Sequence, residues 1–112
     1  TILSYRAIAA VPFTLDDFAG AKHWCNHLLV SPDGRRLIFL HRWRSPTTPN
    51  TYGPVGGFGT RMFTVGVDGR DLFELDPSGY TSHFIWDDAR RITAWTRPPG
   101  QPPGFYRFTD RT

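Results

Sequence analysis

One pattern occurs twice in this chain of 112 residues. A histidine precedes a short apolar segment, a turn with acidic residues follows, and an arginine pair leads into a second apolar segment. The first copy begins at His27 and the second at His83, 56 positions later. That spacing is half the chain. The chain therefore contains an internal repeat, and the fold must accommodate the same strand, turn and strand in two places.

The length of the repeat favours an all-β fold, because it is close to the period of four-stranded propeller blades with a long internal loop. We expect a partial β-propeller of about two consecutive antiparallel blades, within a single fragment, 1–112. Residues 1–22 would end a preceding blade and connect it, 23–76 would form one four-stranded blade, and 80–112 an incomplete next blade. Propellers need about 4 to 8 blades. We therefore expect the chain to be a piece of a longer protein and to pack against the rest of its own propeller.

Turn residues divide the chain into the strands of this fold. Ser31-Pro32-Asp33-Gly34 has Pro and Gly where a type I turn prefers them, and Asp68-Gly69 is typical of a type I′ hairpin. A loop rich in proline and glycine runs from Arg44 to Thr60. The segment from Ser4 to Pro12 is expected to be an outer strand. The other predicted strands are Trp24 to Val30, Arg36 to Trp43, Arg61 to Val67, Arg70 to Leu75, His83 to Trp86, Arg91 to Thr96 and Phe105 to Thr109.

The charged residues narrow the class of partner. The formal net charge is +3, and every basic residue except Lys22 is an arginine. Arginine favours bidentate recognition of carboxylates or phosphates, so an anionic small substrate is one interpretation and a solvated surface is the other. We expect no nucleic acid, because the basic residues form no run or stripe. We expect no membrane partner, since no segment reaches the roughly 18 apolar residues that span a bilayer. The single Cys25 excludes an intrachain disulfide and a multi-cysteine zinc site within this segment.

Two histidines are the first candidates for function. In a propeller the innermost strand of each blade lines the axis, so His27 and His83 would approach the same central cavity from adjacent blades. The alternative is that each histidine makes a structural hydrogen bond to a neighbouring blade, as buried histidines commonly do. The spacing alone leaves both interpretations open.

A second group flanks the long loop. His41 and Arg42 end one predicted strand, and Arg61 begins the next. If these strands pair as a hairpin, all three residues lie on one rim, where an arginine can bind a carboxylate with two parallel hydrogen bonds. The alternative for Arg42 is an ordinary edge-strand charge that discourages sheet-to-sheet pairing.

The ordered set of these motifs resembles the oligogalacturonate lyases. The resemblance covers roughly His23 to Trp86, and it is carried by His27, by His41, by Arg61-Met62, by Asp68-Gly69 and by Ser82-His83-Phe84-Ile85-Trp86. Members of that family are intracellular seven-bladed propellers that split short unsaturated uronides by β-elimination with a divalent metal, usually manganese. The resemblance thus implies a uronide substrate, a manganese or other divalent ion, and a cytoplasmic location, with a periplasmic one as the alternative.

The resemblance also implies roles for individual residues. His83 matches the catalytic base and Arg61 the active-site arginine, while His27 and His41 match histidines of the pocket, and we add Arg42 as a substrate-binding candidate. The family's metal ligands would lie outside this segment, so no metal ligand is expected among its residues. One position departs from the family, since Phe84 stands where the family has an acidic residue.

These residue types suit the implied reaction. The C5 proton of a uronide is weakly acidic, so a metal and an arginine must neutralise the carboxylate as negative charge develops. An arginine stays charged at any relevant pH, and a histidine with a pKa near 6.5 is suited to remove the proton. The alternative function is a non-enzymatic, TolB-like propeller that binds protein or glycan on its rim. The presence or absence of metal ligands elsewhere in the full-length protein would discriminate between the two.

Overall fold

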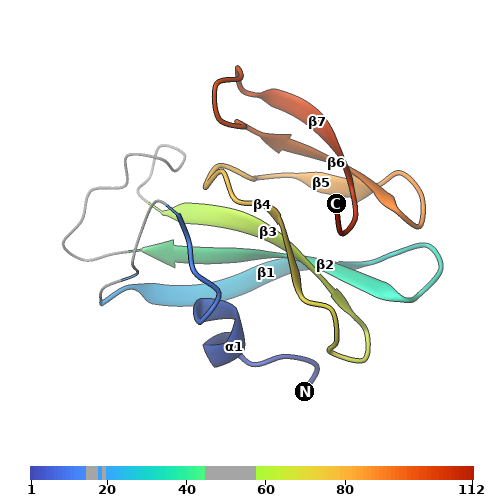
Figure 1. Cartoon of the computed structure of the whole chain (residues 1–112), viewed down its shortest axis with the longest axis horizontal. Coiled ribbons are helices and arrows are strands. Elements are labelled where there is room, and N and C mark those ends of the chain that lie inside the picture. Colours follow the sequence, from blue (N-terminus) through green and yellow to red (C-terminus); the bar gives the residue numbers. More distant parts are fainter. Residues whose placement is uncertain (15–17, 19, 45–57) are drawn as a thin grey trace.

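A computed structural model of the chain describes residues 1–14, 18, 20–44 and 58–112. In these residues it has two antiparallel sheets and one short helix (Figure 1). The first sheet has the strand order β1-β2-β3-β4 and the second the order β5-β6-β7. The elements are α1 (Tyr5–Ala9), β1 (Lys22–Val30), β2 (Arg36–Arg44), β3 (Gly59–Gly66), β4 (Phe73–Asp76), β5 (Phe84–Trp86), β6 (Arg91–Thr96) and β7 (Gly104–Thr109). The predicted all-β class is confirmed. The predicted loop from Arg44 to Thr60 lies mostly outside the described residues.

The segment predicted as an outer strand is a helix, so that prediction is wrong. The side chain of Ser4 caps α1 by accepting a hydrogen bond from the Ala7 N–H at 3.1 Å, and an N-cap serine stabilises a helix by about 1 kcal/mol. Ile8 in the helix and Val11, just beyond the C-cap residue Ala10, both pack on the first sheet. Pro12 follows the helix end, where it prevents continuation. The apolar spacing therefore fits a helix as well as a strand.

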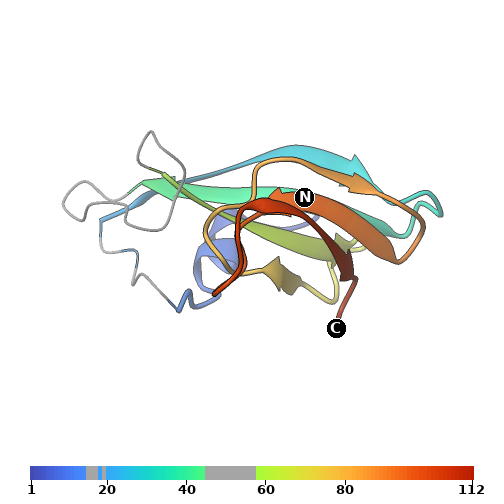
Figure 2. The ribbon, with the colours of Figure 1, turned by 90° about the horizontal axis from the view of Figure 1, so that it is seen from above.

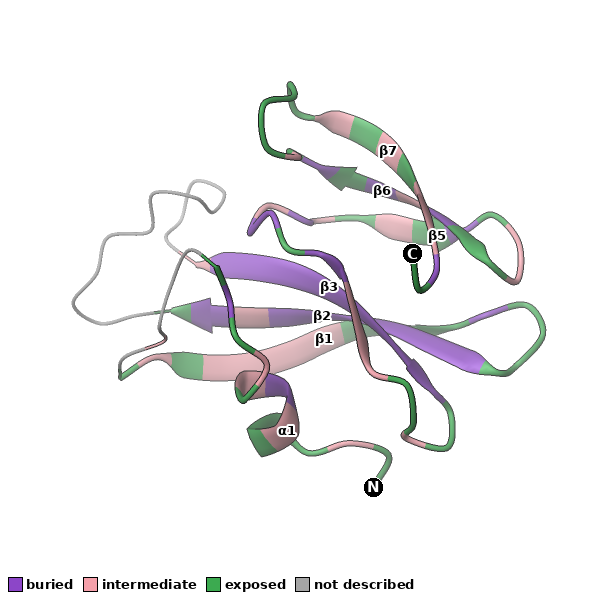
Figure 3. Ribbon diagram, viewed as in Figure 1, coloured by how far each residue is buried: buried purple, intermediate pink, exposed green. Residues whose placement is uncertain are grey.

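The central strands β2 and β3 of the first sheet are buried on both faces, because α1 covers one face and the second sheet covers the other. Ile38 and Leu40 of β2 pack with Ile92 and Ala94 of β6 between the sheets. Leu37 and its neighbours on the opposite face pack under α1. Strand β3 is buried along its whole length (Figure 3). This two-sided burial explains why β2 reads as a continuous apolar run in the sequence.

Two of the predicted turns are present, and one has a different type. The turn at Ser31 closes with a 2.9 Å hydrogen bond from the Gly34 N–H to the Ser31 carbonyl. The β3–β4 turn closes with a hydrogen bond of 2.8 Å from the Gly69 N–H to the Gly66 carbonyl. Gly69 has a φ of +86°, whereas the φ of Asp68 is not positive. A type I′ turn requires positive φ at both central residues. The geometry is therefore that of a type I turn followed by a left-handed glycine, and the prediction of type I′ is wrong.

A buried ionic contact joins the ends of the two sheets. Arg36 of β2 donates from Nε to the Asp110 carboxylate at 2.9 Å and from Nη2 to the Thr64 hydroxyl at 2.8 Å. Thr64 donates in turn to Asp110 at 2.5 Å. On the opposite side of the interface, the Trp86 indole N–H of β5 donates to the Leu29 carbonyl of β1 at 3.1 Å. These contacts fix the second sheet against the first, with β1 beside β5 (Figure 2).

Candidate functional site

His27 and His83 line one hollow between the two sheets. The hollow has a volume of about 240 Å³, and its other lining residues are Leu28, Leu29, Ser82 and Phe84. Both histidines are exposed to solvent. The hollow therefore combines two imidazoles and one hydroxyl in a position that a small molecule can reach.

A bulge in β1 positions His27. Asn26 pairs with Leu40 and Leu29 pairs with Ile38, so the two residues between Asn26 and Leu29 stand opposite one residue of β2. His27 takes φ +57°, a left-handed conformation that costs a non-glycine residue on the order of 1–3 kcal/mol. Bulges re-aim side chains and are frequent beside functional sites. Here the bulge presents His27 to the hollow.

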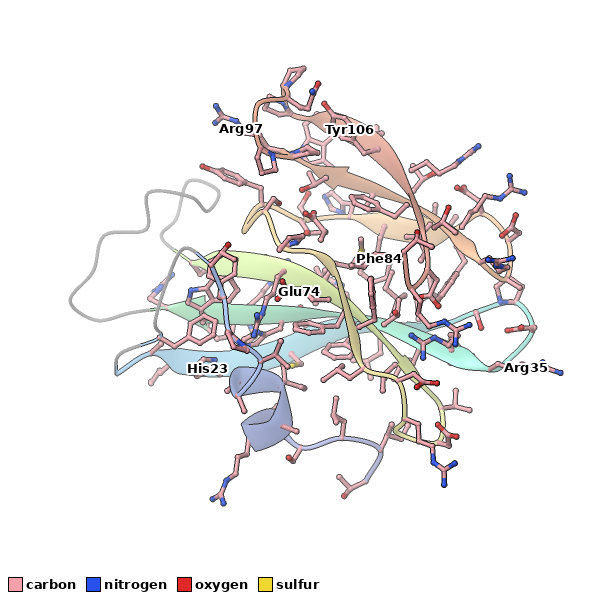
Figure 4. The ribbon with its side chains drawn as sticks, viewed as in Figure 1. His23, Arg35, Glu74, Phe84, Arg97 and Tyr106 are labelled. Carbon is pink, nitrogen blue, oxygen red and sulfur yellow. The ribbon has the colours of Figure 1, made fainter. Side chains whose placement is uncertain are left out.

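The backbone of the second sheet holds His83 in place. The Trp95 N–H donates to the His83 carbonyl at 2.7 Å, and the Ser82 N–H donates to the Trp95 carbonyl at 3.0 Å. Phe84 follows directly and packs against the apolar cluster between the sheets (Figure 4). An acidic side chain at position 84 would be placed against that cluster, which explains physically why this sequence has an aromatic residue there.

Arg61 lies away from this hollow, buried under the N-terminal segment. Its side chain is 0 % exposed. Its five N–H groups meet five acceptors: the His41 Nδ1 atom, the Glu74 carboxylate, and the carbonyls of Ile8, Val11 and Pro12. An arginine has five N–H donors. None is left for a substrate carboxylate in this structure, so Arg61 holds the end of α1 and the chain beyond it against the sheet.

The ion pair between Arg61 and Glu74 is short, with the Arg61 side chain fully buried and the Glu74 side chain 20 % exposed. Glu74 of β4 reaches over the first sheet (Figure 4), and its carboxylate is 2.5 Å from Nη1 of Arg61. Burial raises the pKa of Glu74, and Arg61 opposes that change. Burial also lowers the pKa of Arg61, which Glu74 counteracts. Since a guanidinium does not lose its proton in proteins, the pair acts as a charged structural contact.

His41 is buried beside Arg61 and is neutral. Burial, the charge of Arg61 and the neighbouring His23 together lower its pKa to about 3, with burial the largest cause. Its Nδ1 accepts from Arg61, so the ring proton is on Nε2 and is donated to Nδ1 of His23 at 2.8 Å. The pairing of His41 with Arg61 across β2 and β3 is as predicted. Neither residue lines the hollow, so the structure does not bring either of them to His83.

Arg42 points to the other face of the first sheet, because successive strand residues alternate. It faces the side on which the second sheet packs, whereas His41 and Arg61 face α1. The guanidinium carbon of Arg42 lies 5.2 Å from the centre of the Phe58 ring. Burial lowers the pKa of Arg42, which nevertheless stays charged. All three residues lie at the same end of the paired strands β2 and β3, and strand alternation alone would have predicted that Arg42 faces the other side of the sheet from His41 and Arg61.

Sequence reasoning missed two residues that accompany Arg42. Asn26 and Thr60 lie on the same face of the sheet as Arg42, and each has a buried side-chain oxygen without a hydrogen-bond partner among the described residues. The sequence carries one signal for Asn26, which is its position next to His27. Thr60 could be found only from the register of β2 and β3.

The described ranges contain no group of three His, Cys, Asp or Glu side chains that could hold a metal ion. Since the family resemblance implies metal ligands outside this segment, the divalent ion stays a prediction. Among the same residues, no helix is long and apolar enough to cross a membrane. Comparison with protein families, with curated proteins and with solved structures finds no match to this chain.

Proposed function

We propose that this chain is part of a β-propeller lyase that splits short unsaturated uronides by β-elimination, similar to the oligogalacturonate lyases. The observation that supports the proposal most is that two repeat-related histidines, His27 and His83, line one solvent-accessible hollow. Two repeats that place the same residue type at the same cavity are expected of a propeller axis.

The stacking of the two sheets supports the propeller part of the proposal. The backbone hydrogen bond from the Asp87 N–H to the Arg91 carbonyl is the repeat equivalent of the one from the Ser31 N–H to the Arg36 carbonyl. Leu37 therefore corresponds to Ile92, and Ile38 corresponds to Thr93. Ile38 faces the second sheet and Ile92 faces the first. The two sheets therefore meet through faces that are not repeat equivalents of each other. This head-to-tail stacking is what neighbouring propeller blades do.

In the proposed reaction His83 acts as the base. A neutral imidazole takes the C5 proton, the released electron pair forms the C4=C5 double bond, and the C4–O bond breaks. The departing oxygen takes a proton from water. His27, on the facing strand, binds the substrate within the same hollow. The proposal assigns no metal ligand to the described residues, and no step here passes through a metal.

The role of charge neutralisation does not fall to Arg61 in this proposal. Its donors are fully used by the chain itself, and its side chain is buried. Arg42 is the arginine of the candidate set that keeps unpaired donors, because its Nε has no partner among the described residues. In this proposal a cation other than Arg61 therefore neutralises the carboxylate.

The test uses the full-length protein and an unsaturated diuronide, with product formation followed by absorbance. We expect His83→Ala to reduce the rate by about 10² to 10⁴, the usual cost of losing a general base. Arg35→Ala, at the far end of the molecule from His23 (Figure 4), is the control and should keep the wild-type rate. If His83→Ala retains more than about a tenth of the rate, a fall too small for a general base, the base lies elsewhere.

A second candidate function is a non-enzymatic propeller that binds protein or glycan. The observation that favours it is the burial of Arg61, since a site that has lost its carboxylate-binding arginine is less suited to elimination. Wild-type protein that forms no product from several uronides, with manganese present, would support this candidate over the lyase.

A further inference from the structure

The contact between Arg36 and Asp110 joins the two sheets, and its repeat equivalent is incomplete in this chain. One arginine closes the first turn of each sheet, because the Arg36 carbonyl accepts from the Ser31 N–H and the Arg91 carbonyl accepts from the Asp87 N–H, both at 2.8 Å. Arg91 is therefore the counterpart of Arg36. Arg36 is buried against Asp110, whereas the Arg91 side chain is 56 % exposed. Among the described residues, no neighbouring sheet supplies a carboxylate to Arg91.

Arg91 uses only part of its guanidinium group within the chain. Its Nε and Nη2 atoms each lie 2.6 Å from one oxygen of Asp88, in an exposed ion pair. A guanidinium has five N–H donors, and those of Nη1 have no partner in the part of the chain that the structure describes. Thr93, two residues after Arg91 in β6, pairs with Arg107, so both arginines lie on the same face of the second sheet. Arg107 is also exposed, and the two guanidinium groups can receive a carboxylate from outside.

Apolar side chains continue this face away from the arginines. Trp95 and Phe105 pair across β6 and β7 with ring centroids 5.2 Å apart, and Ile85 of β5 lies on the same face. Exposed stretches of all three strands are visible in Figure 3. By strand register, Trp95 corresponds to Leu40 and Phe105 to Met62, both of which pack in the interface between the sheets. The face therefore fits an occupant that has an apolar surface and a carboxylate at the turn end.

A second copy of this chain does not offer that surface. The Asp110 N–H donates to the Arg90 carbonyl, and in the first sheet the Val67 N–H donates to the Arg35 carbonyl. Val67 thus stands at the position where the carboxylate is required. The face of the first sheet that corresponds to the packed face of the second is covered by α1. The occupant is therefore another sheet, which carries its own acidic residue after its last strand.

We propose that the outer face of the second sheet docks a further sheet of the same repeat, from elsewhere in the full-length chain, and that this sheet places an aspartate on Arg91. The aspartate follows the last strand of that sheet, as Asp110 follows β7. It accepts from the free edge of the Arg91 guanidinium, with Arg107 beside it. The contact reproduces the Arg36–Asp110 contact at the next interface, and the apolar surface of the incoming sheet covers Trp95 and Phe105.

The first test measures whether this face is covered in the full-length protein. Ile85→Cys and Val67→Cys each introduce a thiol at a position that is exposed in this chain, while Cys25 reacts slowly because burial raises its pKa to about 11. We expect a water-soluble thiol reagent to label the Ile85→Cys variant much more slowly than the Val67→Cys control. Equal labelling rates would overturn the inference. Protection that disappears on dilution would assign the face to a second copy of the protein, and would overturn it as well.

The second test isolates the contact at Arg91. Arg91→Met in the full-length protein should lower the melting temperature by several degrees, because it leaves a buried carboxylate without its counter-charge. Asp88→Asn removes the charge of the exposed pair, and Arg90→Met removes a guanidinium from the neighbouring exposed residue. Both controls should change the melting temperature little. An effect of Arg91→Met no larger than that of the controls would contradict the proposed contact.

Neither test depends on the lyase activity. A full-length protein that protects the Ile85→Cys thiol and requires Arg91, but forms no product from uronides, supports the docking face and contradicts the lyase. Elimination that requires His83, in a protein whose Ile85→Cys thiol is labelled freely, supports the lyase and overturns the docking face.

Discussion

At the scale of single residues, Arg61 separates what the sequence can predict from what it cannot. The spacing of two strands around a loop predicts that His41 and Arg61 meet, and they do. The acceptors of Arg61 come partly from Ile8 and Val11, about 50 positions away in the chain. No local pattern encodes that contact, because it depends on where a separate segment packs.

The buried Arg61–Glu74 pair predicts a large effect from a small substitution. Glu74→Gln removes the carboxylate and leaves the guanidinium buried without its counter-charge. Removing one partner of a buried pair costs about 3–5 kcal/mol of the free energy of unfolding. Urea unfolding of the full-length protein measures this loss. Asp88→Asn, which breaks the exposed pair with Arg91, is the matched control and should leave the free energy of unfolding unchanged. Equal effects of the two variants would contradict the structural role of Arg61.

The lowered pKa of buried His41 predicts that the free energy of unfolding depends on pH. In the unfolded chain the imidazole takes up a proton near pH 6.5, whereas in the folded chain burial keeps it neutral down to about pH 3. The folded state therefore binds fewer protons, so its stability is complete above pH 6.5 and falls as the pH is lowered toward 3. The loss approaches about 1.4 kcal/mol per pH unit.

The measurement compares wild type with His41→Gln, which can keep the contacts to Arg61 and His23 but does not titrate. Urea unfolding between pH 7 and pH 4 should show a steeper decline for wild type. Parallel declines would mean that His41 is protonated in the folded protein.

At the scale of elements, the sequence predicts strands and turns better than it predicts the helix. Turn residues act through local sterics, so Ser31-Pro32-Asp33-Gly34 is recognised from its own residues. The segment from Ser4 to Pro12 is short and apolar, and its spacing suits either a strand or a helix. The first sheet decides between them, because it offers an apolar face on which Ile8 and Val11 can pack together.

The two left-handed glycines at the turn ends predict different costs of substitution. Gly34 and Gly69 both have positive φ, so Gly→Ala strains either one by on the order of 1–3 kcal/mol. A Cβ at Gly34 meets nothing within 4 Å, whereas a Cβ at Gly69 would lie 2.4 Å from the Ile2 carbonyl oxygen. We expect Gly69→Ala to lower the melting temperature more than Gly34→Ala. Equal shifts would show that the N-terminal segment moves aside without cost.

At the scale of the whole molecule, the second sheet leaves its outer face uncovered. Ile85, Trp95 and Phe105 are 59, 39 and 67 % exposed on that face. Trp95 and Phe105 are the repeat equivalents of Leu40 and Met62, which are buried by the second sheet. The sequence predicts the repeat. Only the strand register shows that the exposed face of the second sheet corresponds to the face of the first sheet that the second sheet covers.

The uncovered face predicts that the 112-residue chain associates when it is produced alone. Its apolar side chains and its strand edges can pair with another copy. Sedimentation at rising concentration should show species larger than a monomer, and Trp95→Lys with Phe105→Lys should reduce them. A cooperative melt of a monomer at every concentration would contradict this expectation.

The head-to-tail relation between the two sheets has a geometric consequence for assembly. An interface of this kind pairs one surface with a different one, so every added unit presents the same free surface again. Such a series ends only if the rotation from one unit to the next divides a full circle into whole steps, and otherwise it grows into a fibre. In the proposed propeller, the angle set by the Arg36–Asp110 contact and the Trp86–Leu29 contact would determine the ring size, and a substitution that changes this angle would alter how many units fit.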